Sequence, residues 1–400
     1  MEHQRLLAAS VVAVRSLRTN IRSIAGADGR PRSVLVAGPH QLSSVWTRDF
    51  CFCAPGLLAA GEETTVRHTL DEIISRQRKD GLFPRLLDSY HPSMRFFRAV
   101  FGSWIPLRAP LVANFRNEHG APAIDVNALV VSAAVRYALA AENFAWAGLV
   151  LPRLEKALAY YDKRLNDGLI PQSAYADWKD TVARRGPVFF TQLLRWKAHS
   201  DMAELYRRMG RASTADAWSS SAKDQARRAQ RRFWSQDGGY FREKPQTPRL
   251  SSEANLAAIA WDFSDETQGG KILRAMDRRG LLTPWGPCAG ERYPRRSKAF
   301  LARAAGIAGY HDDYVWLWNS ALLLRALKRL NRAALLNDLS GALCAILERD
   351  GVVSEVYRPE NGQEVRTWLF RSERPFSWSA AMLLEAFEDI ASGSPAPAGI

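Results

Sequence analysis

Two carboxylates that flank an indole are the first residues in the sequence whose types and spacing could do chemistry. Asp177, Trp178 and Asp180 lie in the segment Ala-Asp-Trp-Lys-Asp-Thr-Val, a polar stretch that precedes a long apolar one. Neighbouring carboxylates cannot both ionise freely, so one of them can be kept protonated as a general acid. An aromatic plane beside such an acid is a surface on which a sugar ring stacks. The alternative is a helix N-cap, in which Asp177 or Asp180 accepts backbone N–H bonds and Trp178 packs in the core.

Length and composition predict a globular protein with a large core. The chain has 400 residues, of which 47% are hydrophobic, enough for one large or two ordinary domains. No apolar run reaches the roughly 18 residues of a membrane span, and the N-terminus lacks the features of a signal peptide, so we expect a cytoplasmic protein. Cys51 and Cys53 are two residues apart, while Cys288 and Cys344 stand alone. This pattern predicts reduced thiols and makes a zinc site unexpected.

The net charge of +14 raises the question of a nucleic-acid partner. The arginines are scattered, and the densest group has the spacing of a solvated helix face: Arg227, Arg228, Arg231 and Arg232. Neither a glycine-rich phosphate loop nor an aromatic RNA-binding signature accompanies it. We therefore expect no nucleic-acid partner.

A repeated turn and a helical period together predict the architecture. Asp80-Gly81-Leu82-Phe83-Pro84 recurs as Asp167-Gly168-Leu169-Ile170-Pro171, and more loosely at 279–284 and 350–353, as helix-exit turns would. Hydrophobic periodicity near 3.6 predicts helices, and almost no strand, at 3–24, 47–61, 64–78, 126–142, 144–166, 187–209, 211–234, 252–263, 266–279, 313–331, 333–349 and 376–391. Helices in consecutive pairs suggest six hairpins closed into an all-α (α/α)6 toroid.

Polar residues precede every helix that would line the inside of such a ring. They are Trp46, Arg48 and Asp49; Asp125 and Asn127; Asp177 to Asp180; Glu253 and Asn255; Tyr310 to Asp313; and Ser354 with Glu355. We expect these groups to converge at one mouth. The expected organisation is a single catalytic domain over residues 1–391, followed by a disordered tail over 392–400.

Residues 86–123 fall outside the helical pattern and mix arginines with aromatic residues. Long insertions in compact domains are usually functional, so we expect a lid or rim over the pocket. A membrane-surface anchor is the alternative for such a mixture, although no stable membrane association is expected.

Several of these segments resemble the glucoamylase and glycogen-debranching clan of six-hairpin glycosidases. The similar segments are Val45-Trp46-Thr47-Arg48-Asp49-Phe50, Asp177-Trp178-Lys179-Asp180, Ser354-Glu355-Val356-Tyr357 with Asn361-Gly362, and Phe376-Ser377-Trp378-Ser379-Ala380-Ala381. Their order and spacing match across nearly the whole chain. The stretch from Tyr310 to Trp318 is also similar to one in debranching enzymes and neutral invertases. The resemblance implies the toroid and glycoside hydrolysis.

The resemblance also implies a pair of catalytic carboxylates. In the relatives, an acid near the middle of the chain protonates the glycosidic oxygen and a glutamate before the last helix activates water. Inversion needs such a pair on opposite faces of the sugar, about 6.5–9.5 Å apart. Carried over, Glu355 is the base and Asp180 the acid, because debranching enzymes have a Trp-x-Asp arrangement. Asp177 is the reserve acid, and Glu291 is a rival for the base.

Sugar-binding groups are expected beside this pair. Arg48 and Asp49 resemble the pair that grips the terminal sugar in the relatives, and a guanidinium donates to hydroxyls while a carboxylate accepts from them. The alternative is an ion pair that fixes a helix start. The whole expected substrate-binding set is Trp46, Arg48, Asp49, Asp125, Asn127, Asp177, Trp178, His311 and Trp316.

No cofactor or metal is expected, although His311-Asp312-Asp313 could in principle bind a cation, because a second acidic cluster at the matching spacing is absent from the sequence. The sequence thus predicts an inverting hydrolase of a small α-glucoside or oligosaccharide, with a small carbohydrate as its partner. Two alternatives stay open: a glycoside phosphorylase, and an inactive carbohydrate-binding protein, because Lys179 stands where glucoamylases place the acid. The oligomeric state is not predicted.

Overall fold

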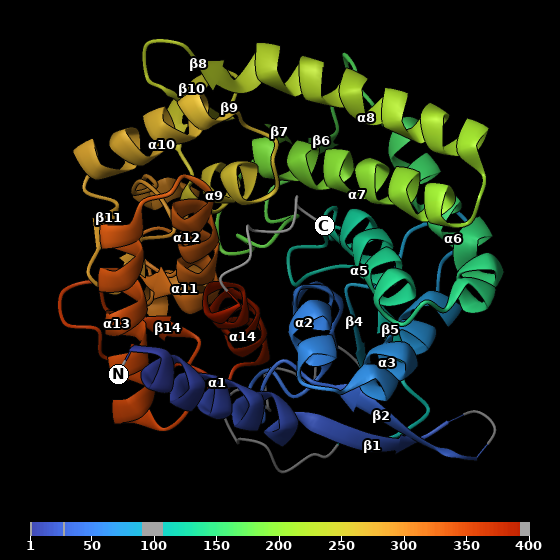
Figure 1. The fold of residues 1–400 in the computed structure, drawn as a ribbon, viewed down its shortest axis with the longest axis horizontal. Coiled ribbons are helices and arrows are strands. Elements are labelled where there is room, and N and C mark those ends of the chain that lie inside the picture. Colours follow the sequence, from blue (N-terminus) through green and yellow to red (C-terminus); the bar gives the residue numbers. More distant parts are fainter. Residues whose placement is uncertain (1, 27–28, 90–106, 393–400) are drawn as a thin grey trace.

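Six helices form a closed inner ring in the computed structural model, which describes residues 2–26, 29–89 and 107–392. They are α2 (Thr47–Ala59), α5 (Val126–Ala140), α7 (Phe189–Arg208), α9 (Ser252–Ala260), α12 (Leu317–Arg329) and α14 (Ser377–Ala391). Each contacts the next in this order, and α14 contacts α2, which closes the ring (Figure 1). The inner helices are buried on nearly every side, and α7 buries charged side chains such as Lys197 and Asp201 among its apolar ones.

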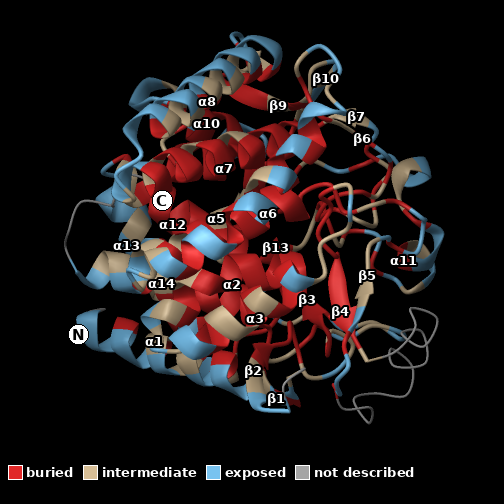
Figure 2. Ribbon diagram, turned by 90° about the vertical axis from the view of Figure 1, so that its right-hand side faces the viewer, coloured by how far each residue is buried: buried red, intermediate tan, exposed pale blue. Residues whose placement is uncertain are grey.

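Six outer helices cover the ring, one beside each inner helix. They are α1 (Glu2–Thr19), α3 (Glu63–Ser75), α6 (Phe144–Asp162), α8 (Ala212–Phe233), α10 (Glu266–Arg278) and α13 (Ala333–Asp350). Figure 2 shows the contrast between the buried inner helices and the outer ones, on which buried, intermediate and exposed residues alternate. On α8 only Ala215, Ala222, Ala229 and Phe233 are buried, and the three alanines recur every seven residues, so one narrow face of small side chains packs on α7. The predicted (α/α)6 toroid is confirmed.

Short strands join the loops between the helices, so the expectation of almost no strand is wrong. β1 (Ile21–Ala25) and β2 (Pro31–Leu35) form a hairpin, and β8 (Trp234–Ser235), β9 (Tyr240–Lys244) and β10 (Thr247–Leu250) form a three-stranded sheet. The first hairpin also explains why the helix expected over 3–24 ends at Thr19. Strands of two to five residues are too short to establish an alternating pattern in the sequence.

The remaining strands lie at the end of the ring where inner helices begin. β3 (Val45–Trp46) pairs with β4 (Leu86–Asp88), which pairs with β5 (Val112–Asn114); the other pairs are β6 (Pro171–Gln172) with β7 (Gly186–Pro187), β11 (Leu282–Thr283) with β12 (Gly286–Pro287), and β13 (Val315–Trp316) with β14 (Val356–Tyr357). β3 runs directly into α2 and β13 into α12. In Figure 2 the strands β3 to β7 lie on the right, with the short helix α11 (Phe300–Ala304), which the sequence does not predict. These pairings fix the polar residues at the helix starts.

The helix-exit turns use glycine in the left-handed conformation, as the turn after α13 illustrates. Gly351 ends α13 in the left-handed conformation, with φ of 64°, as a residue without Cβ does readily. Residues 90–106 of the expected lid (86–123) and the tail 393–400 lie outside the described residues. None of the helices in the described ranges is long and apolar enough to cross a bilayer.

Candidate active site

A cavity of about 250 Å³ opens at the end of the ring where the inner helices begin. Eight of the predicted site residues line it: Trp46, Arg48, Asp49, Trp178, Asp180, His311, Trp316 and Glu355. They come from the segments that precede or begin α2, α7, α12 and α14. Asp125, Asn127 and Asp177 do not line the cavity and lie behind it.

Asp180 presents a partly exposed carboxyl to the cavity. Its side chain is 24% exposed, and Arg85 donates from Nη2 to Asp180 Oδ2 at 3.0 Å. Burial raises the pKa of Asp180, while the positive charges of Arg85 and Arg48 oppose the rise. The sequence suggested that the negative charge of Asp177 would raise the pKa of Asp180. The Asp177 carboxyl is instead bound by Arg184. Asp180 can therefore hold a proton through its own environment.

Glu355 also lines the cavity, where it is buried and both of its oxygens accept hydrogen bonds. The Tyr310 hydroxyl donates to Oε1, and the Glu373 backbone N–H donates to Oε2 at 3.1 Å. The Glu355 N–H in turn donates to the Glu373 carbonyl at 3.0 Å, so the two segments hold each other. Burial raises the pKa of Glu355 to about 8, against the Tyr310 hydrogen bond that favours the ionised form. Its carboxyl is poised for proton exchange near neutral pH.

Arg48 reaches the cavity while Asp125 holds it from behind. Arg48 Nε donates to Asp125 Oδ2 at 2.6 Å and Nη2 donates to Oδ1 at 3.1 Å, which is the bidentate geometry that fixes a guanidinium. Both side chains are buried. Asp125, expected to bind substrate, instead orients Arg48. The neighbouring Asp49 lines the cavity, and burial raises its pKa to about 7 against the charge of Arg48.

Asn127 also differs from the expectation that it binds substrate. Its side-chain oxygen accepts from the Phe83 N–H at 2.9 Å, and its amide donates to the carbonyls of Gly81 at 3.1 Å and Ala157 at 2.8 Å. Both amide hydrogens are thus used within the protein. Asn127 thus holds the first exit turn against α6. A polar group at a helix start can bind a neighbouring loop instead of facing the cavity.

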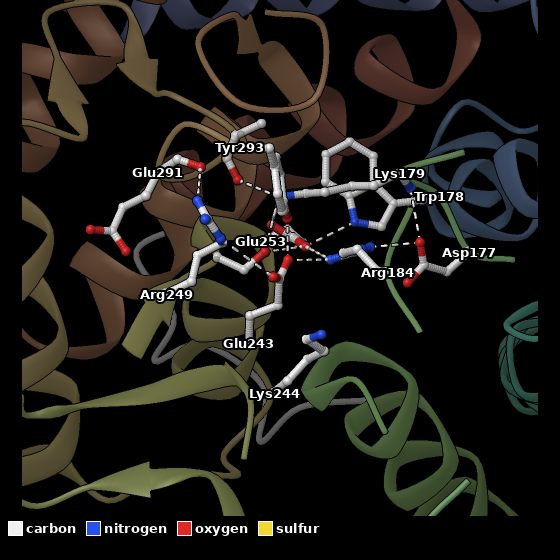
Figure 3. Close-up of polar contacts among 12 residues, drawn as sticks. Asp177, Trp178, Lys179, Arg184, Glu243, Lys244, Arg249, Glu253, Glu291 and Tyr293 are labelled. Atoms are coloured by element: carbon white, nitrogen blue, oxygen red, sulfur yellow. Dashed lines mark hydrogen bonds and ion pairs between the residues drawn. The ribbon is translucent and has the colours of Figure 1, made fainter. Parts of the chain in front are cut away.

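The segment 176–182, which carries Asp180 and is called the acid loop below, is held by a buried network of charges beside Trp178 (Figure 3). Arg184 donates to Asp177 Oδ1 at 2.6 Å and to Glu243 Oε1 at 2.8 Å. Although burial alone would raise it, Arg184 and the hydrogen bond from Gln172 keep the pKa of Asp177 below its ordinary value. Asp177 is therefore an ionised anchor of the loop, and its buried carboxyl lies outside the cavity lining, which does not favour the expected roles in substrate binding and as reserve acid.

Lys179 belongs to the same network and points away from the cavity. Its ammonium lies 3.2 Å from Glu253 Oε2 and donates to Ser251 Oγ and the Ala289 carbonyl, each at 2.9 Å. The Trp178 indole N–H donates to Glu253 Oε1 at 2.9 Å, so Glu253 holds both side chains (Figure 3). Lys179 thus occupies an internal site that leaves the cavity to Asp180.

Aromatic rings fix Trp178 on the remaining sides. Its ring lies edge-on to Trp318 at 4.9 Å and to His311 at 5.0 Å between centroids, and His311 stacks on Trp316 at 5.7 Å. Burial, with the nearby positive charges of Lys179, Arg184 and Arg48, holds the pKa of His311 far below its usual value. The imidazole is therefore neutral, with one ring nitrogen that donates a hydrogen bond and one that accepts.

Eleven further residues line the cavity that were not in the expected catalytic and substrate-binding set. Among them are the polar residues Arg85, Glu118, His119 and Tyr310, and Trp378 adds another aromatic ring. Arg85 follows the Pro84 of the first exit turn, and its guanidinium lies 4.8 Å from the Trp46 ring. Tyr310 belongs to the polar groups that were expected to converge at the mouth, and it lines the cavity. Arg85 is a single arginine after a turn, and no pattern in the sequence marks it as a site residue.

Two other candidates lie outside the cavity. Glu291, the rival for the base, pairs with Arg279 and accepts from the Leu250 N–H at 2.7 Å. Asp312 pairs with Lys298, and Asp313 with Arg292 at 2.6 Å. In the described part of the chain, no group of three or more His, Cys, Asp or Glu side chains is placed to hold a metal ion.

A family model and solved structures match this chain. The model described as the mannosylglycerate hydrolase MGH1-like glycoside hydrolase domain matches residues 176–379, which include both Asp180 and Glu355. None of the curated proteins matches the sequence. The matched segment covers just over half of the 400 residues.

The similar solved structures have little sequence identity but the same fold. A GH63 mannosylglycerate hydrolase from Thermus thermophilus, in complex with Tris, is 14% identical with a TM-score of 0.64, over 94% of this chain and 98% of that one. The same enzyme in complex with Tris and D-glycerate gives a TM-score of 0.66 at 14% identity, over 94% and 99%. A rhamnosidase from Klebsiella oxytoca with rhamnose bound gives 0.68 at 14% identity, over 95% of this chain and 63% of that one. The resemblance to six-hairpin glycosidases is confirmed.

Proposed function

The chain belongs to the mannosylglycerate hydrolase MGH1-like glycoside hydrolase family, and from that premise we propose that it hydrolyses a small α-glycoside, such as an α-glucoside, with inversion. The observation that carries the proposal is that Asp180 and Glu355, far apart in the sequence, line one cavity. Two carboxyl groups facing one sugar are what acid- and base-assisted hydrolysis requires.

In the proposed reaction, Asp180 protonates the glycosidic oxygen as the bond to the anomeric carbon breaks. Glu355 accepts a proton from a water molecule that attacks this carbon from the opposite face. Arg85 donates a hydrogen bond to Asp180, so it orients the carboxyl and stabilises the charge left after proton donation. The Tyr310 hydroxyl donates to Glu355 and orients that carboxyl in the same way.

The raised pKa values of the two carboxyls suit proton transfer at both, but they do not indicate which carboxyl is the acid and which the base. Burial raises the pKa of Asp180 and raises that of Glu355 to about 8. Raised values suit an acid directly, whereas a base must be ionised to accept a proton. The assignment of Glu355 as base therefore rests on the resemblance and on its place before the last inner helix.

The dimensions and walls of the cavity support a small substrate. Its volume of about 250 Å³ lies just below the ~300–1,000 Å³ usual for ligand pockets. Arg48 and Asp49 offer a donor and an acceptor to sugar hydroxyls, and Trp46 offers an aromatic wall. The terminal sugar is expected to sit among these three residues.

Product analysis on a substrate panel tests this function. The panel contains α-glucosides, α-mannosides and α-rhamnosides, each with a sugar and with a glycerate aglycone, since the similar structures are described with mannosylglycerate hydrolase activity, glucose, D-glycerate or rhamnose. We expect hydrolysis of at least one member, lost in Asp180→Asn and in Glu355→Gln. Activity that survives in both variants would refute the assignment. A sugar phosphate formed only with inorganic phosphate would identify a phosphorylase instead.

A further inference from the structure

Four large apolar side chains are exposed beside the mouth of the cavity. On α11, Phe300 and Leu301 are 71% and 62% exposed, and in the turn 367–370, Trp368 and Leu369 are 77% and 61% exposed. We call these four residues the apolar rim. Exposed apolar groups that gather in one place mark interaction sites more often than scattered ones do.

The turn presents Trp368 and Leu369 at its tip. The Thr367 N–H donates to the Phe370 carbonyl at 2.8 Å, and the Phe370 N–H donates to Thr367 Oγ1 at 3.1 Å. These bonds leave Trp368 and Leu369 as the two central residues. Such positions are usually taken by Gly, Asn, Asp, Ser or Pro. Neither Trp nor Leu favours a turn in this way, so turn formation does not explain the exposed apolar surface of the tip, and a binding partner would.

The two halves of the apolar rim lie together at the cavity. Thr367 Oγ1 donates to the Ala305 carbonyl at the end of α11, at 2.6 Å. The Phe370 ring lies 5.6 Å from the Tyr310 ring, and Tyr310 and Leu301 both line the cavity. In Figure 2, α11 lies exposed at the end of the molecule that carries β3 to β7. The apolar rim therefore borders the mouth.

Exposed arginines flank the apolar rim on both segments. Arg366 and Arg371 pair through their backbones at the base of the turn, and Arg295 and Arg296 precede α11. All four are exposed, and none has an acidic partner among the residues that the structure describes. Residues 292–308 contain five Lys and Arg and no Asp or Glu, of which Arg292 and Lys298 pair with Asp313 and Asp312, and the whole chain carries +14. This surface is complementary to a negatively charged, partly apolar one.

We propose that the apolar rim docks the protein reversibly on an anionic lipid bilayer. Trp368 and Leu369 enter the boundary between headgroups and acyl chains, where an indole and an aliphatic side chain are both favourable. The flanking arginines contact lipid phosphates, each strengthening binding about fivefold. Docking in this orientation turns the cavity mouth toward the membrane surface, where a glycoside held at the bilayer would meet it. The inference is independent of which sugar is cleaved.

Co-sedimentation of the full chain with vesicles tests the proposal without any substrate. The vesicles contain phosphatidylcholine alone or with about 30% phosphatidylglycerol, which supplies the anionic surface. We expect binding to the anionic vesicles that weakens with added salt, because arginine–phosphate attraction is screened. Trp368→Ser with Leu369→Ser should weaken binding about tenfold or more, since the tip loses its apolar area. The single variant Trp368→Phe keeps an aromatic ring and should largely retain binding. Arg366→Gln with Arg371→Gln should weaken binding about 25-fold at low salt.

Matched controls separate docking from misfolding. Leu149→Ser removes an apolar side chain that is 79% exposed on α6 and should leave vesicle binding unchanged. Thermal unfolding of each variant should match the wild type, because exposed substitutions change stability little. Absence of wild-type binding to anionic vesicles, or equal binding by the Trp368→Ser/Leu369→Ser variant, would overturn the proposal. Sedimentation velocity that shows a dimer dissociated by the same variant would assign the apolar rim to a second copy instead.

Discussion

Replacing Glu355 by glutamine should stabilise the protein, and the gain should grow with pH. In the folded protein burial raises the pKa of Glu355 from 4.5 to about 8. The folded state therefore holds this proton more tightly than the unfolded chain does. Stability from this group is fully present below pH 4.5 and is lost as the pH rises to about 8, where the folded protein must ionise a buried carboxyl.

The magnitude follows from the two pKa values. Each unit between the pH and 4.5, up to about 8, costs ~1.4 kcal/mol, so the penalty is on the order of 3 kcal/mol at pH 7 and 5 kcal/mol at pH 8. Glutamine carries no charge at any of these pH values; its oxygen can accept from the Glu373 N–H, while its NH2 group donates to the oxygen of the Tyr310 hydroxyl. Glu355→Gln should thus be nearly neutral at pH 4.5 and stabilising at pH 8.

Urea unfolding of wild type and variant at pH 4.5, 6, 7 and 8 measures this difference. Comparing the two proteins at each pH removes the contributions of groups that both retain. Glu360→Gln, which removes an exposed carboxylate from the neighbouring loop, is the matched control for the substitution. A difference that does not change with pH, or that favours the wild type at pH 8, would mean that the folded protein solvates Glu355 well, and would refute the reasoning from burial.

Three further substitutions test the other parts of the site. Asp180→Asn should lower kcat by about 10²–10⁴-fold with little change in KM, because proton donation acts in the transition state; steady-state kinetics checks this, and an unchanged kcat would remove Asp180 from the role of acid. Arg48→Ala should weaken binding of the terminal sugar in calorimetric titration and, by leaving Asp125 buried and unpaired, should destabilise the fold by about 3–5 kcal/mol; equal affinity would leave Arg48 with a structural role alone. Lys179→Met should destabilise the protein by a similar ~3–5 kcal/mol in urea unfolding because it leaves Glu253 without its buried cation, and unchanged stability would show that the pair is dispensable.

The ring of helices could be predicted because each helix carries its own pattern. The helix expected over 47–61 is observed at Thr47–Ala59, and that over 126–142 at Val126–Ala140. Predicted ends overrun by a few residues, since apolar periodicity continues into the turn that follows. The strands and α11 were missed because two to five residues contain too little of any period. Their pairing also depends on partners far away in the chain.

The cavity could be predicted in outline, from the rule that polar groups precede inner helices. That rule finds Arg48 and Glu355, but it also selects Asp125 and Asn127, whose side chains bind protein groups behind the cavity. Whether a polar side chain faces a pocket or a neighbouring loop depends on the partner that meets it, and partners such as Ala157 are not visible in the spacing. Asp177 illustrates the same limit, because its arginine becomes a neighbour only through the fold of the loop.

The anomer first released from a cleaved substrate is the most direct test of the central claim that Asp180 and Glu355 act on opposite faces of one sugar. Proton NMR of the reaction, recorded before mutarotation equilibrates the product, reads it without any variant. From an α-glycoside, the proposed mechanism predicts the β-anomer as the first product. An initial α-anomer would require a covalent intermediate on one carboxylate, and would contradict activation of water by Glu355.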